Sequence, residues 1–255
     1  MRILAIDTAT ENCSAALLVD ANVQFREIEM ERGHAERILP MIDDLLAEAG
    51  ITLHDLDAIA FGRGPGSFTG VRLAVTVTQG LAFGASLGVV PISDLRAVAQ
   101  RALRQDPTLT RVLVCNDARM NEVYWACFER GGDGLARLEG EERVSKPSEV
   151  KLPAGWSTAT PVGRGFIAYA DALRDAVATA APPPELPHPT PVDIAPAESL
   201  LHLLPHATDI ALLAAPDVTA GRLIPPEAAT PIYLRDNVAH VAQPPKPPAT
   251  PGNPG

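Results

Sequence analysis

Two short stretches of this 255-residue sequence carry side chains that could lie beside a phosphate group. The first is Ile6-Asp7-Thr8-Ala9-Thr10, where a carboxylate and small hydroxyl residues follow a predicted strand and enter a hairpin. A carboxylate at the end of a strand can sit beside a metal-bound phosphate. Asp is also common in Asx turns that join two strands, so Asp7 and Thr8 have a structural interpretation as well as a functional one.

The second stretch is a glycine loop between a predicted strand and a predicted helix. Four glycines in the nine residues 62–70 permit positive φ and close approach of the backbone. Ser67 or Thr69 can cap the helix that follows, and the N-terminus of that helix could hold an anion. No Gly-Lys-Ser/Thr follows, so this is not a Walker A loop. Gly64, Gly66, Ser67 and Thr69 fit either a phosphate loop, working or vestigial, or a tight turn without a ligand.

The sequence predicts no metal centre and no catalytic residues. His34 opens a predicted helix, but a metal-binding pair would need a second histidine one turn later, and that position is Ile38. His202 and His206 have helical spacing, yet Pro205 between them spoils the geometry. No Ser/His/Asp or Cys/His arrangement is visible.

Charge and composition exclude several classes of protein. The net charge is −10, which disfavours binding to duplex nucleic acid through bulk electrostatics. No run of 18 apolar residues exists, which excludes a membrane-spanning helix. The three cysteines form no CxxC pair, which suits a reducing compartment. The turn from Asp117 to Arg119 is interpreted first as a local ion pair, and otherwise as a contact with a partner or an anion.

The elements that must position these residues occur twice in the same order. Each half reads strand–strand–strand–helix–strand–helix, which fits a ribonuclease-H-like unit, and two such units would leave a cleft between them. We therefore expect an α/β fold of two lobes with mixed sheets and flanking helices. The lobes are expected at 1–105 and 106–240, with a final helical segment that could pack back on the first lobe. Residues 241–255 are rich in proline and are predicted to be disordered.

Several of these motifs resemble the TsaB family, also called YeaZ. The resemblance is carried by residues 3–11, His34 with Ile38-Leu39-Pro40, the glycine loop 64–72, residues 117–124 and residues 231–235, and it spans about residues 1–239. It implies the fold of the actin-like ATPases (the ASKHA superfamily). It also implies a role in making threonylcarbamoyl-adenosine in tRNAs that read codons starting with A.

In that family the transfer is performed by a paralogue, TsaD, which carries two metal-binding histidines on one helix. The resemblance matches the first with His34 but places Ile38 at the second, and the second lobe lacks the expected adenosine-binding segment. It therefore implies a cytoplasmic, non-catalytic scaffold that activates TsaD, works with the ATPase TsaE and can self-associate. It implies no intrinsic cofactor, ATP or ADP only within the complex, and indirect contact with tRNA. The alternative is an autonomous enzyme, either a small-molecule kinase or a metallopeptidase.

The predicted helices at 34–49 and 70–85 carry more apolar residues than one sheet face needs. We expect them to present an exposed patch that pairs with TsaD or with a second copy of the chain. The residues expected in that patch are Ile42, Leu45, Leu46, Val77 and Leu81.

Overall fold

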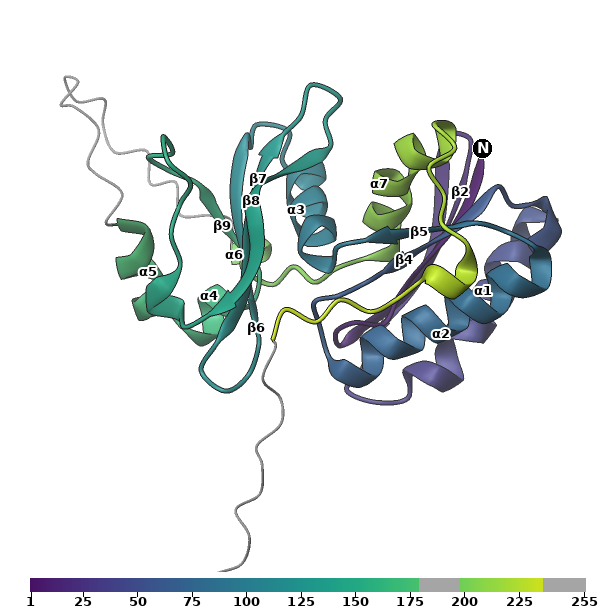
Figure 1. Cartoon of the computed structure of the whole chain (residues 1–255), viewed down its shortest axis with the longest axis horizontal. Helices are drawn as coiled ribbons and strands as arrows, with labels where there is room; N and C mark the ends of the chain where they lie inside the picture. The colour runs from purple at the N-terminus through teal and green to yellow at the C-terminus, as the bar shows by residue number, and fades with distance from the viewer. Residues whose placement is uncertain (179–197, 236–255) are drawn as a thin grey trace, which may run out of the picture.

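The computed structural model describes residues 1–178 and 198–235, and these form two α/β lobes joined side by side (Figure 1). The proline-rich stretch Pro182–Pro191, which the sequence predicts to be an extended linker or a surface loop, lies outside the described residues, as does the tail 241–255, predicted to be disordered. Within the described part of the chain, no helix is long and apolar enough to cross a membrane.

The first lobe is built on a five-stranded mixed sheet in the order β3-β2-β1-β4-β5. Its central strand β1 pairs antiparallel with β2 and parallel with β4, as the repeated element order predicts. β1, β2 and β4 are buried along almost their whole length, whereas β3 forms an edge. The strands are β1 Arg2–Asp7, β2 Asn12–Val19, β3 Asn22–Glu29, β4 Ala58–Gly62 and β5 Val89–Ile92.

Helices cover both faces of this sheet. On one face α1 (His34–Ala49) and α2 (Phe68–Ala85) bury an aliphatic core against the strands. On the other face lies α7 (Ala207–Thr219), which returns from the far end of the chain and packs on β1 and β2. Short 3-10 turns at Leu53–Asp55 and Pro226–Ala228 complete the lobe.

The second lobe repeats the plan on a smaller scale. Its four-stranded sheet has the order β8-β7-β6-β9, with β6 antiparallel to β7 and parallel to β9. One face is covered by α3 (Asp94–Gln105) and the other by α5 (Ala170–Ala178). The remaining elements are β6 Arg111–Asp117, β7 Val123–Arg130, β8 Ala136–Ser145, β9 Thr160–Val162, α4 Gly165–Ala168, α6 Glu198–Leu201 and a 3-10 turn at Pro147–Glu149.

Pro40 lies in the second turn of α1, where the helix continues without that one amide donor. α3, which falls before the expected boundary at residue 105, packs on the sheet of the second lobe and so connects the two units.

Candidate functional site

A cleft lies between the lobes, where the β1–β2 hairpin faces the β6–β7 hairpin. Three adjoining hollows make it up, with volumes of about 380, 630 and 470 Å³. Thr10, Glu11 and Arg119 line all three hollows, so they mark its centre. Phe68, Tyr233 and Arg235 line the 470 Å³ hollow beside the glycine loop, and Ser67 lines both that hollow and the 630 Å³ one.

Asp7, the first candidate phosphate-site residue, does not face this cleft. Its side chain is fully buried, and its Oδ1 accepts a hydrogen bond from the Ala9 amide at 2.9 Å, which is an Asx turn. Its second contact is the carboxyl group of Asp94 at the start of α3. Burial raises the pKa of Asp7 to about 6. This carboxyl group is therefore engaged inside the protein.

Thr8 and Ser67 both use their hydroxyl groups at the start of α2. The buried Thr8 hydroxyl donates to the Gly70 carbonyl at 2.6 Å. Ser67 caps α2 by accepting from the Gly70 amide at 3.1 Å, whereas Thr69 is exposed at the edge of the cleft. Of the two caps that the sequence allowed, the structure uses Ser67.

The glycines of the loop let other parts of the backbone come close. A Cβ on Gly66 would lie 2.6 Å from the Ala9 carbonyl oxygen, and one on Gly64 would lie 2.7 Å from the Ile232 carbonyl oxygen. Gly64 also has φ +99°, in the region that favours glycine. The structure thus accounts for both glycines by contacts within the protein, in keeping with the tight-turn interpretation.

A C-terminal strap, residues 231–235, crosses from the first lobe to the second. The Ile232 amide donates to the Arg63 carbonyl at 2.7 Å, and Tyr233 accepts from Arg72 Nε at 2.7 Å. At its end, Arg235 donates to the Ala118 carbonyl at 3.1 Å and pairs with Glu122. Its sequence was noticed only as part of the resemblance, and nothing in the residue types indicates this bridging role.

The strap holds a strained turn at the tip of the β6–β7 hairpin. Arg119, Met120 and Asn121 all have φ near +60°, which is uncommon for residues with a Cβ. Asp117 Oδ1 accepts from the Arg119 amide at 2.8 Å, and the two side chains form the predicted local pair at 3.1 Å. Arg119 remains largely exposed and reaches within 3.9 Å of Glu11 across the cleft.

His34 has a structural contact. Its Nε2 lies 2.8 Å from the Thr10 carbonyl oxygen, tying the start of α1 to the β1–β2 hairpin. Among residues 1–178 and 198–235, no group of three or more His, Cys, Asp or Glu side chains is arranged to hold a metal ion.

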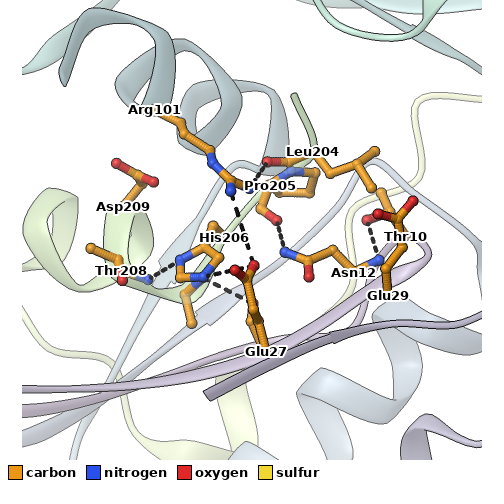
Figure 2. Close-up of polar contacts among 12 residues, drawn as sticks. Thr10, Asn12, Glu27, Glu29, Arg101, Leu204, Pro205, His206, Thr208 and Asp209 are labelled. Carbon is orange, nitrogen blue, oxygen red and sulfur yellow. Dashed lines mark hydrogen bonds and ion pairs between the residues drawn. The ribbon is translucent and has the colours of Figure 1, made fainter. Parts of the chain in front are cut away.

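The chain returns to the first lobe through a densely bonded junction at residues 204–208 (Figure 2). Arg101 of α3 donates to the Leu204 carbonyl at 3.2 Å, and Asn12 donates to the Pro205 carbonyl at 3.0 Å. His206 is buried, caps α7 by accepting from the Thr208 amide, and lies 3.2 Å from Glu27. Its sequence position suggests only a possible pairing with His202 as metal ligands, and no local pattern indicates this capping role.

The outer surface of α1 and α2 corrects the expected interface residues. Ile42, Leu45 and Leu46 are 1%, 0% and 7% exposed and belong to the core, so placing them in an exposed patch was wrong. These three residues are apolar because they lie on the side of α1 that packs against the sheet. Val77 and Leu81 are only partly buried against the same core.

Other residues form the exposed part of these two helices. Leu39 of α1 is 46% exposed and Phe83 of α2 is 77% exposed. Gly80 and Gly84 are also exposed, and a Cβ added to either would meet no atom within 4 Å. These glycines therefore serve no close packing within the described part of the chain. We call Leu39, Gly80, Phe83 and Gly84 the outer α1–α2 face.

Comparison with known proteins agrees with this geometry. Residues 26–163 match the family model described as TsaD, tRNA N6-adenosine threonylcarbamoyltransferase. The chain is 42% identical to the tRNA threonylcarbamoyladenosine biosynthesis protein TsaB of Escherichia coli strain K12, over 94% of this chain and 96% of that protein. It is 43% identical to TsaB of Haemophilus influenzae, over 66% and 74% of the two chains.

Solved structures give the same assignment. A crystal structure of YeaZ from Pseudomonas aeruginosa matches with a TM-score of 0.76 and 41% identity, over 91% of this chain and 99% of that one. A second, described as similar to peptidase YeaZ from the same organism, matches with a TM-score of 0.77. The two mixed sheets, the cleft between two hairpins and these relatives define an actin-like α/β protein. The chain belongs to the TsaB (YeaZ) family, whose curated relatives are named as tRNA threonylcarbamoyladenosine biosynthesis proteins.

Proposed function

We propose that this chain is a non-catalytic subunit that activates a TsaD-like transferase in the formation of threonylcarbamoyl-adenosine. It does so by dimerising with the transferase through the outer α1–α2 face. The observation that carries the proposal is this face itself: Phe83 is exposed with Gly80 and Gly84 on α2, and Leu39 is exposed on α1. Small residues with open space above them let a second helix approach closely, and exposed apolar side chains supply the contact area.

The cleft supports the non-catalytic part of the proposal. The strand-end carboxylate Asp7, which could sit beside a metal-bound phosphate, is instead buried against Asp94. His34, where the transferase family is expected to have a metal ligand, is bonded to the Thr10 carbonyl. Both observations disfavour the second candidate, an autonomous kinase or metallopeptidase.

The partners follow from the same proposal. The chain acts in the cytoplasm beside a TsaD-like transferase and a TsaE-like ATPase, and it contacts tRNA indirectly through the complex. It has no intrinsic cofactor, and ATP or ADP binds only within the assembled complex. Self-association would use the outer α1–α2 face when the transferase is absent, so the two dimers would exclude one another.

Two single substitutions test the docking face. Leu39→Glu and Phe83→Glu should each weaken binding to the transferase by about tenfold or more, because a carboxylate would be desolvated without a partner. Both positions are exposed, so the thermal midpoint of the free chain should change little. The measurement is calorimetric titration with the purified transferase.

Leu138→Glu is the matched control, since Leu138 is 40% exposed on β8 of the other lobe. It should bind like the unchanged chain. Unchanged affinity in both Leu39→Glu and Phe83→Glu would place the docking face elsewhere.

A further inference from the structure

Two buried carboxyl groups, Asp7 and Asp94, meet beside the glycine loop. Asp7 ends β1 and Asp94 begins α3, and both side chains are 0% exposed. One oxygen of each has a backbone donor: Asp7 Oδ1 accepts from the Ala9 amide at 2.9 Å, and Asp94 Oδ2 accepts from the Gly64 amide at 2.5 Å. The pair therefore links β1, α3 and the loop.

The other two oxygens have no ordinary partner. Asp7 Oδ2 and Asp94 Oδ1 are buried and accept no hydrogen bond from any described residue. Space is also tight, because a Cβ on Gly62 would lie 2.3 Å from Asp94 Oδ1 and 2.9 Å from Asp7 Oδ1. Two carboxyl groups in contact at a buried site are strongly favoured to share a proton, with one group donating it to the other, because two buried like charges repel.

We propose that Asp7 and Asp94 share one proton, and that this proton is a pH-sensitive latch that fastens the glycine loop to the ends of β1 and α3. Asp94 holds the proton and Asp7 accepts it. Burial raises the pKa of both groups, and the neighbouring Asp7 raises the pKa of Asp94 further. The latch is independent of which partner the protein binds.

None of the charged and titratable groups around the pair donates a hydrogen bond that could take the place of the shared proton. His34 of α1 acts on Asp7 from the cleft side, and Cys13 of β2 lies behind it. Burial raises the pKa of Cys13 to about 12, so the thiol stays neutral. Arg63 of the loop acts on Asp94 from a distance, and its guanidinium is paired with Glu142 of β8 at 3.1 Å. None of these side chains hydrogen-bonds to either carboxyl group.

Alkaline pH should open the latch. When Asp94 loses its proton, two negative charges are left in buried contact, and the bond between Asp94 and the Gly64 amide can survive only if the pair separates. The folded chain binds this proton more tightly than the unfolded chain, so stability falls as pH rises through the pKa of the pair. The N-terminus of α2, which follows the loop, should loosen with it.

The first test follows the thermal midpoint from neutral to alkaline pH. The unchanged chain should lose several degrees, whereas Asp94→Asn should lose much less, since its amide can donate to Asp7 and its oxygen can still accept from Gly64. Asp209→Asn is the control, because this buried side chain is paired with the guanidinium of Arg104 at 2.9 Å and not with a second carboxyl group. The thermal midpoint of this variant should still fall at alkaline pH, as it does in the unchanged chain. Equal loss in the unchanged chain and in Asp94→Asn would overturn the proposal.

The second test needs no substitution. Amide hydrogen exchange of Gly64, which donates to Asp94, is compared with that of Arg63, which donates to the Ile92 carbonyl at 2.8 Å in the same loop. The protection of Gly64 relative to Arg63 should fall as pH rises toward the pKa of the pair, by up to about tenfold per pH unit, and should level off above that pKa. A ratio that stays constant with pH would show that no shared proton holds the loop.

Discussion

The imidazole of His206 and the carboxylate of Glu27 lie 3.2 Å apart, from Nε2 to Oε2, where the chain passes from the second lobe to the first (Figure 2). His206 Nδ1 accepts from the Thr208 amide, so the remaining proton is on Nε2 and points to Glu27. The ring is neutral in this arrangement. A second proton would remove the acceptor that caps α7.

Acid should therefore destabilise the protein through His206. Burial, with smaller contributions from Arg101 and Arg104, lowers the pKa of His206 from 6.5 to about 4. Glu27 opposes this shift, but it is 40% exposed, so burial dominates. As pH falls, the unfolded chain takes up this proton before the folded chain does. The contribution of His206 to the free energy of unfolding is therefore present above pH 6.5 and is lost as pH falls toward 4, by about 3 kcal/mol at most.

Urea unfolding between pH 7 and pH 4 measures this loss. His206→Asn should keep the cap, because asparagine can accept from the Thr208 amide, and should lose less stability over this range. His202→Asn, at an exposed position in the same segment, is the control and should behave like the unchanged chain. The same acid loss in His206→Asn would show that another group is responsible.

Alanine at Gly80 and Gly84 should change stability and binding in opposite directions. Both glycines have open space around them, Gly80 in the interior of α2 and Gly84 in its last turn. Alanine should therefore stabilise the free chain by about 0.5–1 kcal/mol at Gly80 and by less at Gly84. The added methyl groups should hold a docking helix away and weaken transferase binding. Chemical unfolding measures the stability of these variants, and calorimetric titration measures their affinity for the transferase. Stabilisation without weaker binding would mean that no helix docks over these glycines.

Removing only one partner of the ion pair between Arg104 and Asp209 should lower the stability of the protein. Two bonds of 2.9 and 3.2 Å join them, and Asp209 is 0% exposed although Arg104 is 43% exposed. Arg104→Met leaves a buried carboxylate without its partner, and we expect a loss of about 2–3 kcal/mol in the free energy of unfolding. Asp209→Asn in the same chain should recover part of that loss. The more exposed pair Arg111–Glu129 is the comparison, where Arg111→Met should cost under about 1 kcal/mol.

The strap should control the strained β6–β7 turn. Arg235→Gln removes the pairing with Glu122 and the bond to the Ala118 carbonyl, so residues 118–122 should exchange their amide hydrogens faster. Exchange in α1, far along the chain from this contact, should not change. Mass-spectrometric hydrogen exchange gives both readings together. Slow exchange at 118–122 in the variant would mean that the Asp117–Arg119 contacts hold the turn without the strap.

Local sequence patterns predicted the helices and strands of this fold well because these elements depend on interactions between residues that are close in the sequence. The helix predicted over 34–49 is α1, His34–Ala49. The three-strand order in each half gave the mixed sheets correctly. Periodicity identifies which residues are apolar on one side of a helix, but it does not tell which of the apolar residues are left uncovered. For that reason Leu45 and Leu46 were assigned to the outside, and Phe83 was not.

The contacts that shape the cleft come from residues far apart in the sequence. Asp94 is 87 residues from Asp7, and its contact with that residue has no local signature. Ile232 lies beside Arg63 and Gly64 because the chain returns to the first lobe, which the sequence suggested only as a possibility for its final helical segment. The glycine loop could be found from composition, whereas its use as a packing surface could not.

Reconstituted tRNA modification tests the central claim most directly. The purified transferase subunit, the ATPase and the threonylcarbamoyl donor would be combined with unmodified tRNA, with and without this chain, and with its Leu39→Glu and Phe83→Glu double variant. We predict modified tRNA only with the unchanged chain, and no product or ATP turnover from the chain alone. Full modification with the double variant or without the chain, or ATP turnover by the isolated chain, would contradict the account.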